Sequence, residues 1–327
     1  MLENHASHRL ATAVVSVLVV GVLNSAGCAQ PQAGGTEGVA TTSSGSTGDT
    51  SETGDPESCV ELGPERFIDV SVSELHGCAV RESGAVQCWG DDEYGKVSGA
   101  PCTAFTQVAA GRDQTCGLHP DGTIECWGPP GAIKAPADDD FVAVTSGSTS
   151  RHTCGHREGG AIVCWGGSYE TDDLGPFPAG VYTQVAVSGN QTCGLQKNGV
   201  TCQRKVVGEF LIGGDYKRMA ATQSDGCTIR QDDTLYCWWN SPAGPPSGSY
   251  SDIFGGQDVI CALDLGGKPS CFTRDPDDPI GPLIDAEPDV GLSQLSINSD
   301  IACGLRDDKT MLCWGHETPV LTGAPAT

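Results

Sequence analysis

Cysteine is the residue type with the clearest potential for chemistry in this sequence. Most of the 17 cysteines fall into pairs whose members are ten residues apart, or nine in the fourth pair. Metal sites favour CxxC-type spacing with histidines nearby, and this spacing is absent. So many cysteines would also be unusual in a reducing cytosol. The pattern favours disulfides in an oxidising compartment over buried reduced thiols, and the pairs are Cys78 with Cys88, Cys116 with Cys126, Cys154 with Cys164, Cys193 with Cys202, Cys227 with Cys237, Cys261 with Cys271, and Cys303 with Cys313.

Other reactive side chains form no recognisable catalytic motif. The sequence has neither G-x-S-x-G nor H-E-x-x-H. Acidic clusters occur, but none matches a calcium-binding loop, so we interpret them as solvated loop acids. We therefore predict no catalytic residue, no cofactor and no metal site, and a protein that is not an enzyme. The alternative is a polysaccharide hydrolase or lyase whose paired carboxylates meet only in space. The clusters are Asp91–Glu93, Asp138–Asp140, Asp172–Asp173 and Asp275–Asp278.

Two histidines share one position relative to the cysteine pairs. His76 and His152 each lie two residues before the first cysteine of a pair, where other pairs have Gln114 or Gln191. One interpretation is a polar ring at the mouth of a channel. The interpretation that we favour is structural, with each side chain bonded to the turn before a strand.

The elements that position the cysteines are short hairpins. In Cys116–Gly128 (CGLHPDGTIECWG), two short apolar arms flank a Pro-Asp-Gly turn, which is typical of a β-hairpin. Closing such a hairpin places its two cysteines opposite one another on the same face, at bridging distance. We therefore predict one disulfide in each of seven hairpins.

The hairpins belong to a longer repeat. Successive first cysteines, from Cys78 and Cys116 to Cys303, are 34 to 42 residues apart. An aromatic or apolar residue and an aliphatic residue three positions later precede each pair, as in Phe67 and Val70. This period is typical of one propeller blade. We predict an all-β, seven-bladed β-propeller over residues 59–327, closed by an extended segment from residues 59–62 or 319–325.

Written out in full, the repeat resembles that of the regulator of chromosome condensation family. The shared pattern is an aromatic, an aliphatic, a glycine, Cys-x-Leu, a turn and Cys-Trp-Gly, followed by a loop of which Trp89–Gly99 (WGDDEYGKVSG) is the closest copy. The resemblance covers the chain from Phe67 onward and implies a seven-bladed propeller. A secreted relative, the β-lactamase inhibitor protein II, uses this fold as a rigid platform that blocks an enzyme. The resemblance is weaker where Trp-Gly is lost, at Gln203–Arg204, Trp238–Trp239 and Phe272–Thr273.

The N-terminal region has the features of a bacterial lipoprotein. Leu10–Leu23 is a short apolar run, and it is followed by small residues and Cys28, which resembles a lipobox. We predict a signal peptide over residues 1–27, lipidation of Cys28, and a disordered Gly/Ser/Thr-rich tether over residues 28–58. Because Ala29 is not an aspartate, the prediction favours an outer-membrane location over simple secretion.

Composition limits the partners. The chain has 42 acidic and 18 basic residues and a net charge of -24, which would repel nucleic acid and anionic membranes. We expect a monomer that touches the membrane only through its lipid and binds an extracellular or periplasmic protein or glycan. Aromatic side chains in polar loops are the candidate anchors for this partner, and they are Tyr94, Tyr169, Phe177 and Trp239.

Two cysteines remain after the seven pairs and Cys28 are assigned. We predict that these two, Cys59 and Cys102, pair with each other.

Overall fold

A computed structural model describes residues 66–129, 134–166, 176–189, 191–204, 208–238, 244–273, 283, 288–316 and 318–325. The chain divides into two units, Met1–Val60 and Glu61–Thr327, and every described residue lies in the second. The predicted signal peptide, tether and lipidation site at Cys28 lie outside the described residues, as do Cys59, Tyr169 and Trp239.

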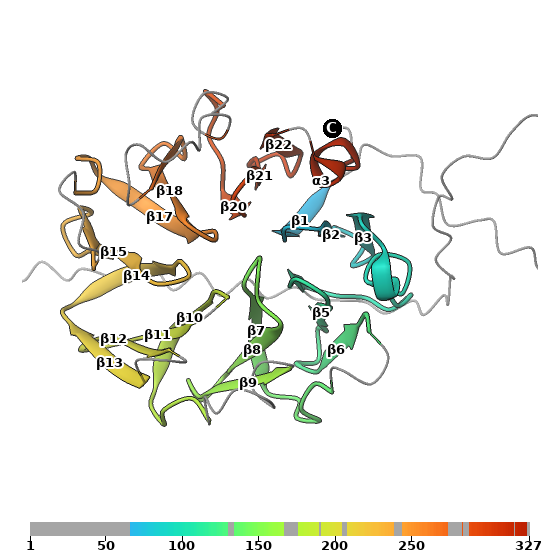
Figure 1. Ribbon diagram of the computed structural model, residues 1–327, viewed down its shortest axis with the longest axis horizontal. Helices are drawn as coiled ribbons and strands as arrows, with labels where there is room; N and C mark the ends of the chain where they lie inside the picture. Colours follow the sequence, from blue (N-terminus) through green and yellow to red (C-terminus); the bar gives the residue numbers. More distant parts are fainter. Residues whose placement is uncertain are drawn as a thin grey trace, which may run out of the picture. The chain divides into compact units, whose positions relative to one another are not determined.

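The second unit is a seven-bladed β-propeller, which confirms the predicted fold class. Each blade is an antiparallel sheet of consecutive strands, and Figure 1 shows the seven sheets arranged around a centre. Blades 1 to 4 contain β1 (Phe67–Val72), β2 (His76–Arg81), β3 (Val86–Gly90); β4 (Gln107–Ala110), β5 (Thr115–Leu118), β6 (Ile124–Trp127); β7 (Phe141–Ser146), β8 (His152–Arg157), β9 (Ile162–Gly166); and β10 (Tyr182–Val187), β11 (Gln191–Gln196), β12 (Gly199–Arg204), β13 (Gly208–Gly213).

The remaining blades repeat the three-strand plan. Blades 5 to 7 contain β14 (Tyr216–Ala221), β15 (Gly226–Arg230), β16 (Leu235–Cys237); β17 (Tyr250–Gly255), β18 (Val259–Asp264), β19 (Pro269–Thr273); and β20 (Gln294–Ile297), β21 (Ile301–Leu305), β22 (Met311–Gly315). Two short helices complete the described elements, η1 (Glu93–Gly95) and α3 (Pro319–Thr322). None of the described helices is long and apolar enough to span a membrane.

All seven predicted disulfides are present, one in each blade. In blade 1, Cys78 on β2 is directly opposite Cys88 on β3, and their Cα atoms are 4.0 Å apart. The other six pairs have the same placement. The hairpin turns explain why the spacing is so regular. Gly122 in the turn of blade 2 has φ +85°, and a Cβ atom there would lie 2.3 Å from the carbonyl oxygen of Asp139, so only glycine fits.

The core consists of apolar side chains between neighbouring blades. In blades 2, 3 and 4, the aromatic residue that begins the blade lies over the glycine that follows the first cysteine, as Phe105 does over Gly117. A Cβ atom on Gly117 would lie 2.3 Å from the Phe105 ring. The Cys-Gly step therefore provides space for the aromatic ring that the repeat places upstream. Phe105 is 1% exposed and also packs against Trp127.

Among the described residues, the ring closes without exchanging a strand between its ends; the predicted closing segment at residues 59–62 lies outside them. Blade 1 and blade 7 each contain only their own consecutive strands. Residues 319–322 form helix α3, so the predicted closing strand at 319–325 is wrong. The helix packs on blade 1 through Val320, which shares a core cluster with Trp89. We call the contact between the first and last blades the seam. Two hydrogen bonds across it join the Phe67 amide to the Lys309 carbonyl (2.8 Å) and the Val72 amide to the Ser296 hydroxyl (2.9 Å).

The innermost strands of the seven blades surround a central channel of about 360 Å³. Its lining includes Asp69, Gln107, Gln184 and Gln294. Most of these side chains are used in holding blades together. The Asp69 carboxylate accepts a hydrogen bond from the Val108 amide of blade 2 at 2.7 Å and another from the Gln294 amide group of blade 7.

Candidate functional site

The loops that could bind a partner leave one end of the propeller. In blade 1, His76 at the start of β2 is opposite Gly90 at the end of β3. The turn before β2 and the loop after β3 are therefore neighbours, and the Asp91 amide donates to the Leu75 carbonyl. The same arrangement recurs in the other blades, so we call this end the loop face. The turns between the second and third strands lie at the opposite end.

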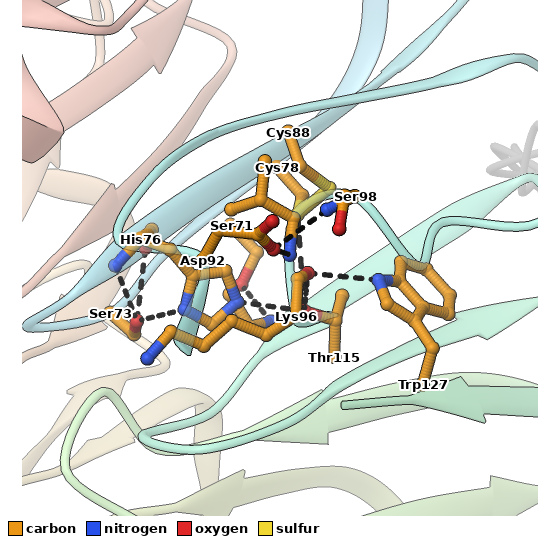
Figure 2. Close-up of a disulfide and its surroundings, with 12 residues drawn as sticks. Ser71, Ser73, His76, Cys78, Cys88, Asp92, Lys96, Ser98, Thr115 and Trp127 are labelled. Atoms are coloured by element: carbon orange, nitrogen blue, oxygen red, sulfur yellow. Dashed lines mark hydrogen bonds between the residues drawn. A yellow bond between two sulfur atoms is a disulfide. The ribbon is translucent and has the colours of Figure 1, made fainter. Parts of the chain in front are cut away.

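The best-defined segment of the loop face is Asp91–Gly99, which follows β3 and includes η1. Lys96 holds it from beneath, with a side chain that is fully buried. A buried ammonium group is costly unless it is paired, and its Nζ atom lies 2.6 Å from Oδ2 of Asp91. Figure 2 shows that the Lys96 carbonyl also accepts hydrogen bonds from the Trp127 indole (2.9 Å) and the Thr115 hydroxyl (3.2 Å) of blade 2.

Asp92 fixes the rest of the loop. Its Oδ1 atom accepts hydrogen bonds from the amides of Val97 and Ser98, both at 2.8 Å. The Gly99 amide donates to the Gly95 carbonyl at 2.9 Å. The acidic pair Asp91–Asp92 therefore serves the loop itself, and its carboxylates are engaged by groups of the chain rather than directed at a ligand.

Tyr94 lies at the exposed tip of this fixed loop. Its side chain is 53% exposed, and its backbone has φ 69°. A left-handed conformation is uncommon for a bulky residue and persists only where its surroundings impose it. Lys96 and Asp92 provide that constraint. The loop thus presents an aromatic ring to solvent from a fixed backbone position.

Charged groups lie beside the tyrosine. The Glu93 carboxylate raises the pKa of the Tyr94 phenol, so the ring stays neutral. Asp113 and Arg151, from the turns of blades 2 and 3, form an ion pair at 3.0 Å, in which the Arg151 side chain is 59% exposed. Tyrosine and arginine are both enriched in protein interfaces, so this pair of exposed side chains is typical of a binding surface.

The position of His76 and His152 is structural. His76 is fully buried; its Nδ1 atom lies 3.0 Å from the Ser73 hydroxyl and its Nε2 atom 2.7 Å from the Thr115 hydroxyl of blade 2. His152 makes the equivalent contact with Thr192 of blade 4, at 3.0 Å. Burial lowers the pKa of His76 to about 3 and that of His152 to about 4. Both rings are neutral and join adjacent blades, which confirms the favoured interpretation and excludes an open polar ring.

The other candidate anchors have different fates. Phe177 is only 7% exposed and packs edge-on against Tyr182, with ring centroids 5.2 Å apart. It is therefore a packing residue, and its proposed role as an exposed anchor is wrong. Tyr169 and Trp239 lie outside the described residues. Sequence reasoning missed Lys96 and Arg151, because a buried lysine and an exposed arginine look alike in a sequence without their neighbours.

No group of three or more potential metal ligands occurs among the described residues. Of the acidic clusters, Asp138 and Asp140 both pair with Arg157, the former at 2.5 Å and the latter at 3.2 Å. Burial raises the pKa of Asp69, in the channel, to about 7. No other carboxylate lines the described part of the channel.

Comparisons with known proteins agree with this architecture. Residues 67–96, which span blade 1 and the loop with Tyr94 and Lys96, match the family model for the regulator of chromosome condensation (RCC1) repeat. No curated protein matches the chain in a sequence search.

Three solved structures are similar in fold. The ectodomain of the receptor kinase CR4 from Physcomitrella patens is 24% identical, over 77% of this chain and 74% of that chain, with a TM-score of 0.63. The CRINKLY WD40 ectodomain of the receptor kinase ACR4 from Arabidopsis thaliana is 20% identical, over 79% and 98%, with a TM-score of 0.63. Prp20p from Saccharomyces cerevisiae is 14% identical, over 62% and 71%, with a TM-score of 0.51. At these identities the likeness concerns the fold alone.

Proposed function

We propose that this propeller, whose first repeat matches the RCC1 repeat model, is a non-enzymatic binding platform whose loop face recognises a protein partner, with Tyr94 as the central anchor. The observation that carries the proposal is a solvent-exposed aromatic ring on a loop fixed from beneath. Prp20p has binding properties toward Gsp1p and histones, so the fold serves protein recognition in at least one structural neighbour.

A pre-ordered loop favours binding because little conformational entropy is lost when the partner arrives. Asp91–Gly99 is held by the Lys96–Asp91 ion pair and by the amides bonded to Asp92. Tyrosine adds a large contact area with few rotatable bonds, and a nearby arginine, Arg151, can bond a partner's carboxylate or carbonyl. The partner is therefore expected to insert Tyr94 into an apolar pocket and to place an acceptor beside Arg151.

A hydrolase or lyase acting on polysaccharide is the alternative function. It requires two carboxylates within about 5 to 10 Å of one another in a cleft. The described channel offers Asp69, whose two oxygens already accept hydrogen bonds from Val108 and Gln294. This arrangement favours a structural role for Asp69 over acid-base chemistry.

The proposed site of action is the cell envelope. Seven disulfides favour an oxidising extracellular or periplasmic compartment. We propose that residues 1–27 are removed, that Cys28 is lipidated, and that residues 28–58 tether the propeller to the outer membrane. Fatty-acid labelling of wild-type chain and Cys28→Ala expressed in a bacterial host tests this, since labelling should be lost in the variant. Equal labelling of both chains would contradict lipidation at Cys28.

Site-specific photocrosslinking tests the binding face. A photoreactive phenylalanine analogue at position 94 should crosslink a discrete partner in the native envelope. Position 142 is a matched control, because Val142 is also 53% exposed and lies at the start of β7, at the opposite end of the propeller. Crosslinks of equal yield from both positions, or a crosslinked species from position 142 alone, would contradict the proposal.

With the partner purified, substitution separates contact from folding. We expect Tyr94→Ala to weaken binding about 30-fold or more, corresponding to the roughly 2 kcal/mol lost at an interface hot spot, with the melting temperature unchanged. Lys268 makes an exposed ion pair with Asp289 at the opposite end of the propeller, so Lys268→Ala is the control and should leave affinity unchanged. If the partner is a glycan, the same substitutions should weaken binding. Treatment of the partner with a glycosidase should then abolish the binding.

A further inference from the structure

Blade 4 has a fourth strand, β13, and it is the only four-stranded sheet among those described. β13 pairs with β12 along its whole length, from Gly208 opposite Arg204 to Gly213 opposite Gly199. None of its six residues is buried, and no other described strand has this property. β12 is the one described element with which it makes extensive contact. The outer side of β13 is therefore an open sheet edge.

The register determines which backbone groups face outward. Cys193 and Cys202 lie opposite one another with Cα atoms 4.0 Å apart, the short separation of a non-hydrogen-bonded antiparallel pair. In a pair of this kind, each residue directs its N–H and C=O groups away from the other strand. Cys202 therefore directs its N–H and C=O toward β13, where it is opposite Phe210. Phe210 thus bonds to β12. Its neighbours Glu209 and Leu211 turn their N–H and C=O groups to the open edge.

The side chains of β13 differ on its two faces. Phe210 and Ile212 pack against the core cluster around Cys202 and Met219. Leu211 is on the other face and is 61% exposed, with the exposed Glu209 two residues before it. Natural edge strands are usually protected by charges, proline or a covering segment. β13 has no proline, its one charged residue is Glu209 near its start, and no described element pairs with its outer side.

We propose that β13 is a second docking site, at which an extended segment of a partner protein adds a fifth strand to blade 4. Two outward donors and two outward acceptors at the open edge require an extended backbone with the complementary spacing. Cross-strand pairing then defines the side chains: an apolar residue opposite Leu211 and a basic residue opposite Glu209. In an antiparallel partner these two residues are in the order apolar, any residue, Lys or Arg.

Charge favours such a partner over a second copy of this chain. Two copies would each carry a net charge of -24, and their repulsion opposes association. A segment with a basic residue is instead attracted to Glu209 and to the net negative charge of the chain. This site lies on the rim of blade 4 and is independent of the Tyr94 surface, so either proposal can fail without the other.

A peptide of the required pattern tests the proposal directly. The probe is the capped, fluorescent peptide STVTLTKTS, whose leucine would lie opposite Leu211 and whose lysine opposite Glu209. Fluorescence anisotropy with the full chain should show saturable binding. N-methylation of the peptide's leucine, which removes the N–H that faces β13, should weaken binding at least tenfold. N-methylation of the threonine just before the leucine, which faces away, should leave binding within twofold.

Protein variants test the same geometry from the other side. Leu211→Pro removes an outward N–H without removing a bond to β12, so binding should be lost while the fold is retained. Glu209→Lys should reverse the preference, so that a peptide with glutamate in place of lysine binds more tightly than the original. If Leu211→Pro fails to fold, the two N-methylated peptides still decide the matter with wild-type protein.

Three outcomes would overturn the proposal. The peptide could fail to bind, or both N-methylated peptides could bind equally, which would show that the backbone edge is not used. The third is self-association of the full chain in sedimentation velocity that Leu211→Pro abolishes, which would identify a second copy as the occupant.

Discussion

The Nε2 atom of His76 in blade 1 lies 2.7 Å from the hydroxyl oxygen of Thr115 in blade 2. The same hydroxyl donates to the Lys96 carbonyl at 3.2 Å, so its oxygen contacts both the ring and the loop. One buried threonine thus connects two blades and the loop that presents Tyr94. The contact makes blade packing and the candidate binding loop parts of the same network.

Replacing Thr115 by valine tests this network. The change keeps the shape of the side chain but removes the hydrogen-bond partner of the His76 Nε2 atom and one donor to the Lys96 carbonyl, which should cost about 1 to 3 kcal/mol of unfolding free energy. Thr183→Val is the control, because Thr183 is exposed and its loss should fall within about 0.5 kcal/mol. Urea unfolding measures both. Equal losses in the two variants would show that the contact between blades contributes nothing special.

The buried histidines should make the protein sensitive to acid. The pKa values of His76 and His152 are lowered to about 3 and about 4 in the fold, whereas an unfolded histidine takes up a proton near pH 6.5. The contribution of these histidines to stability is therefore fully present above about pH 6.5 and is lost as the pH decreases, by about 1.4 kcal/mol per pH unit for each histidine.

Glutamine is the suitable replacement, because Gln114 and Gln191 occupy the same position in blades 2 and 4. In urea unfolding between pH 4.5 and 6.5, His76→Gln and His152→Gln should each reduce the pH dependence by about one histidine's contribution. An unchanged slope in both variants would mean that the histidines are protonated in the folded protein.

Asp69 should act with the opposite sign. Burial raises its pKa to about 7, so between about pH 4 and 7 the folded protein holds a proton that the unfolded chain has lost, and stability falls as the pH rises. Asp69→Asn cannot ionise and can still accept from the Val108 amide. It should therefore gain stability relative to wild type at pH 7.5 compared with pH 4.5.

The control for Asp69 is Asp215→Asn, since Asp215 is exposed and its replacement should have a small effect at both pH values. A constant difference between wild type and Asp69→Asn across this range would contradict a raised pKa.

The backbone conformation of Tyr94 should be visible in stability. Asparagine tolerates a positive φ better than other side chains, while alanine pays the full steric cost. Tyr94→Asn should accordingly be about 1 kcal/mol more stable than Tyr94→Ala in urea unfolding, although both lose the aromatic ring. Equal stability of the two variants would indicate that the loop relaxes when the ring is removed.

Alkylation counts the disulfides. Unreduced, denatured protein should show no labelling at the fourteen cysteines of the seven blades. The predicted bridge between Cys59 and Cys102 is read from the same experiment, because label at those two positions would exclude it. Each blade disulfide closes a short loop and contributes roughly 2 to 3 kcal/mol in the chain-entropy model, so reduction should lower the melting temperature strongly.

Much of the fold could be predicted from the sequence because the same repeat pattern recurs seven times. The cysteine spacing determines the hairpin, and the hairpin determines the pairing of Cys78 with Cys88 and its equivalents. The fourth strand of blade 4 was missed, although Gly208–Gly213 has three consecutive apolar residues between glycines. The repeat there has lost its Trp-Gly, and without that marker the strand is hard to distinguish from a loop.

The candidate site was only partly predictable. Tyr94 was found because an aromatic residue in an acidic loop is conspicuous, but Phe177 has the same signature and is buried beside Tyr182. Lys96 could not be found, since lysine is usually exposed and its burial depends on Asp91 and on two donors from the next blade. Loop residues are positioned by long-range contacts that a repeat does not encode.

The closure of the ring without strand exchange has a consequence for how the protein is made. In the part of the chain that the structure describes, every sheet uses neighbouring strands, and each of the seven blade disulfides joins cysteines nine or ten residues apart. A blade can therefore form and oxidise as soon as its own stretch of chain emerges, with little opportunity for mispaired cysteines. The final step is non-local, because two hydrogen bonds of the seam have sequence separations of 224 and 225 residues. Synthesis thus assembles an open arc, blade by blade, and the last blade completes the circle.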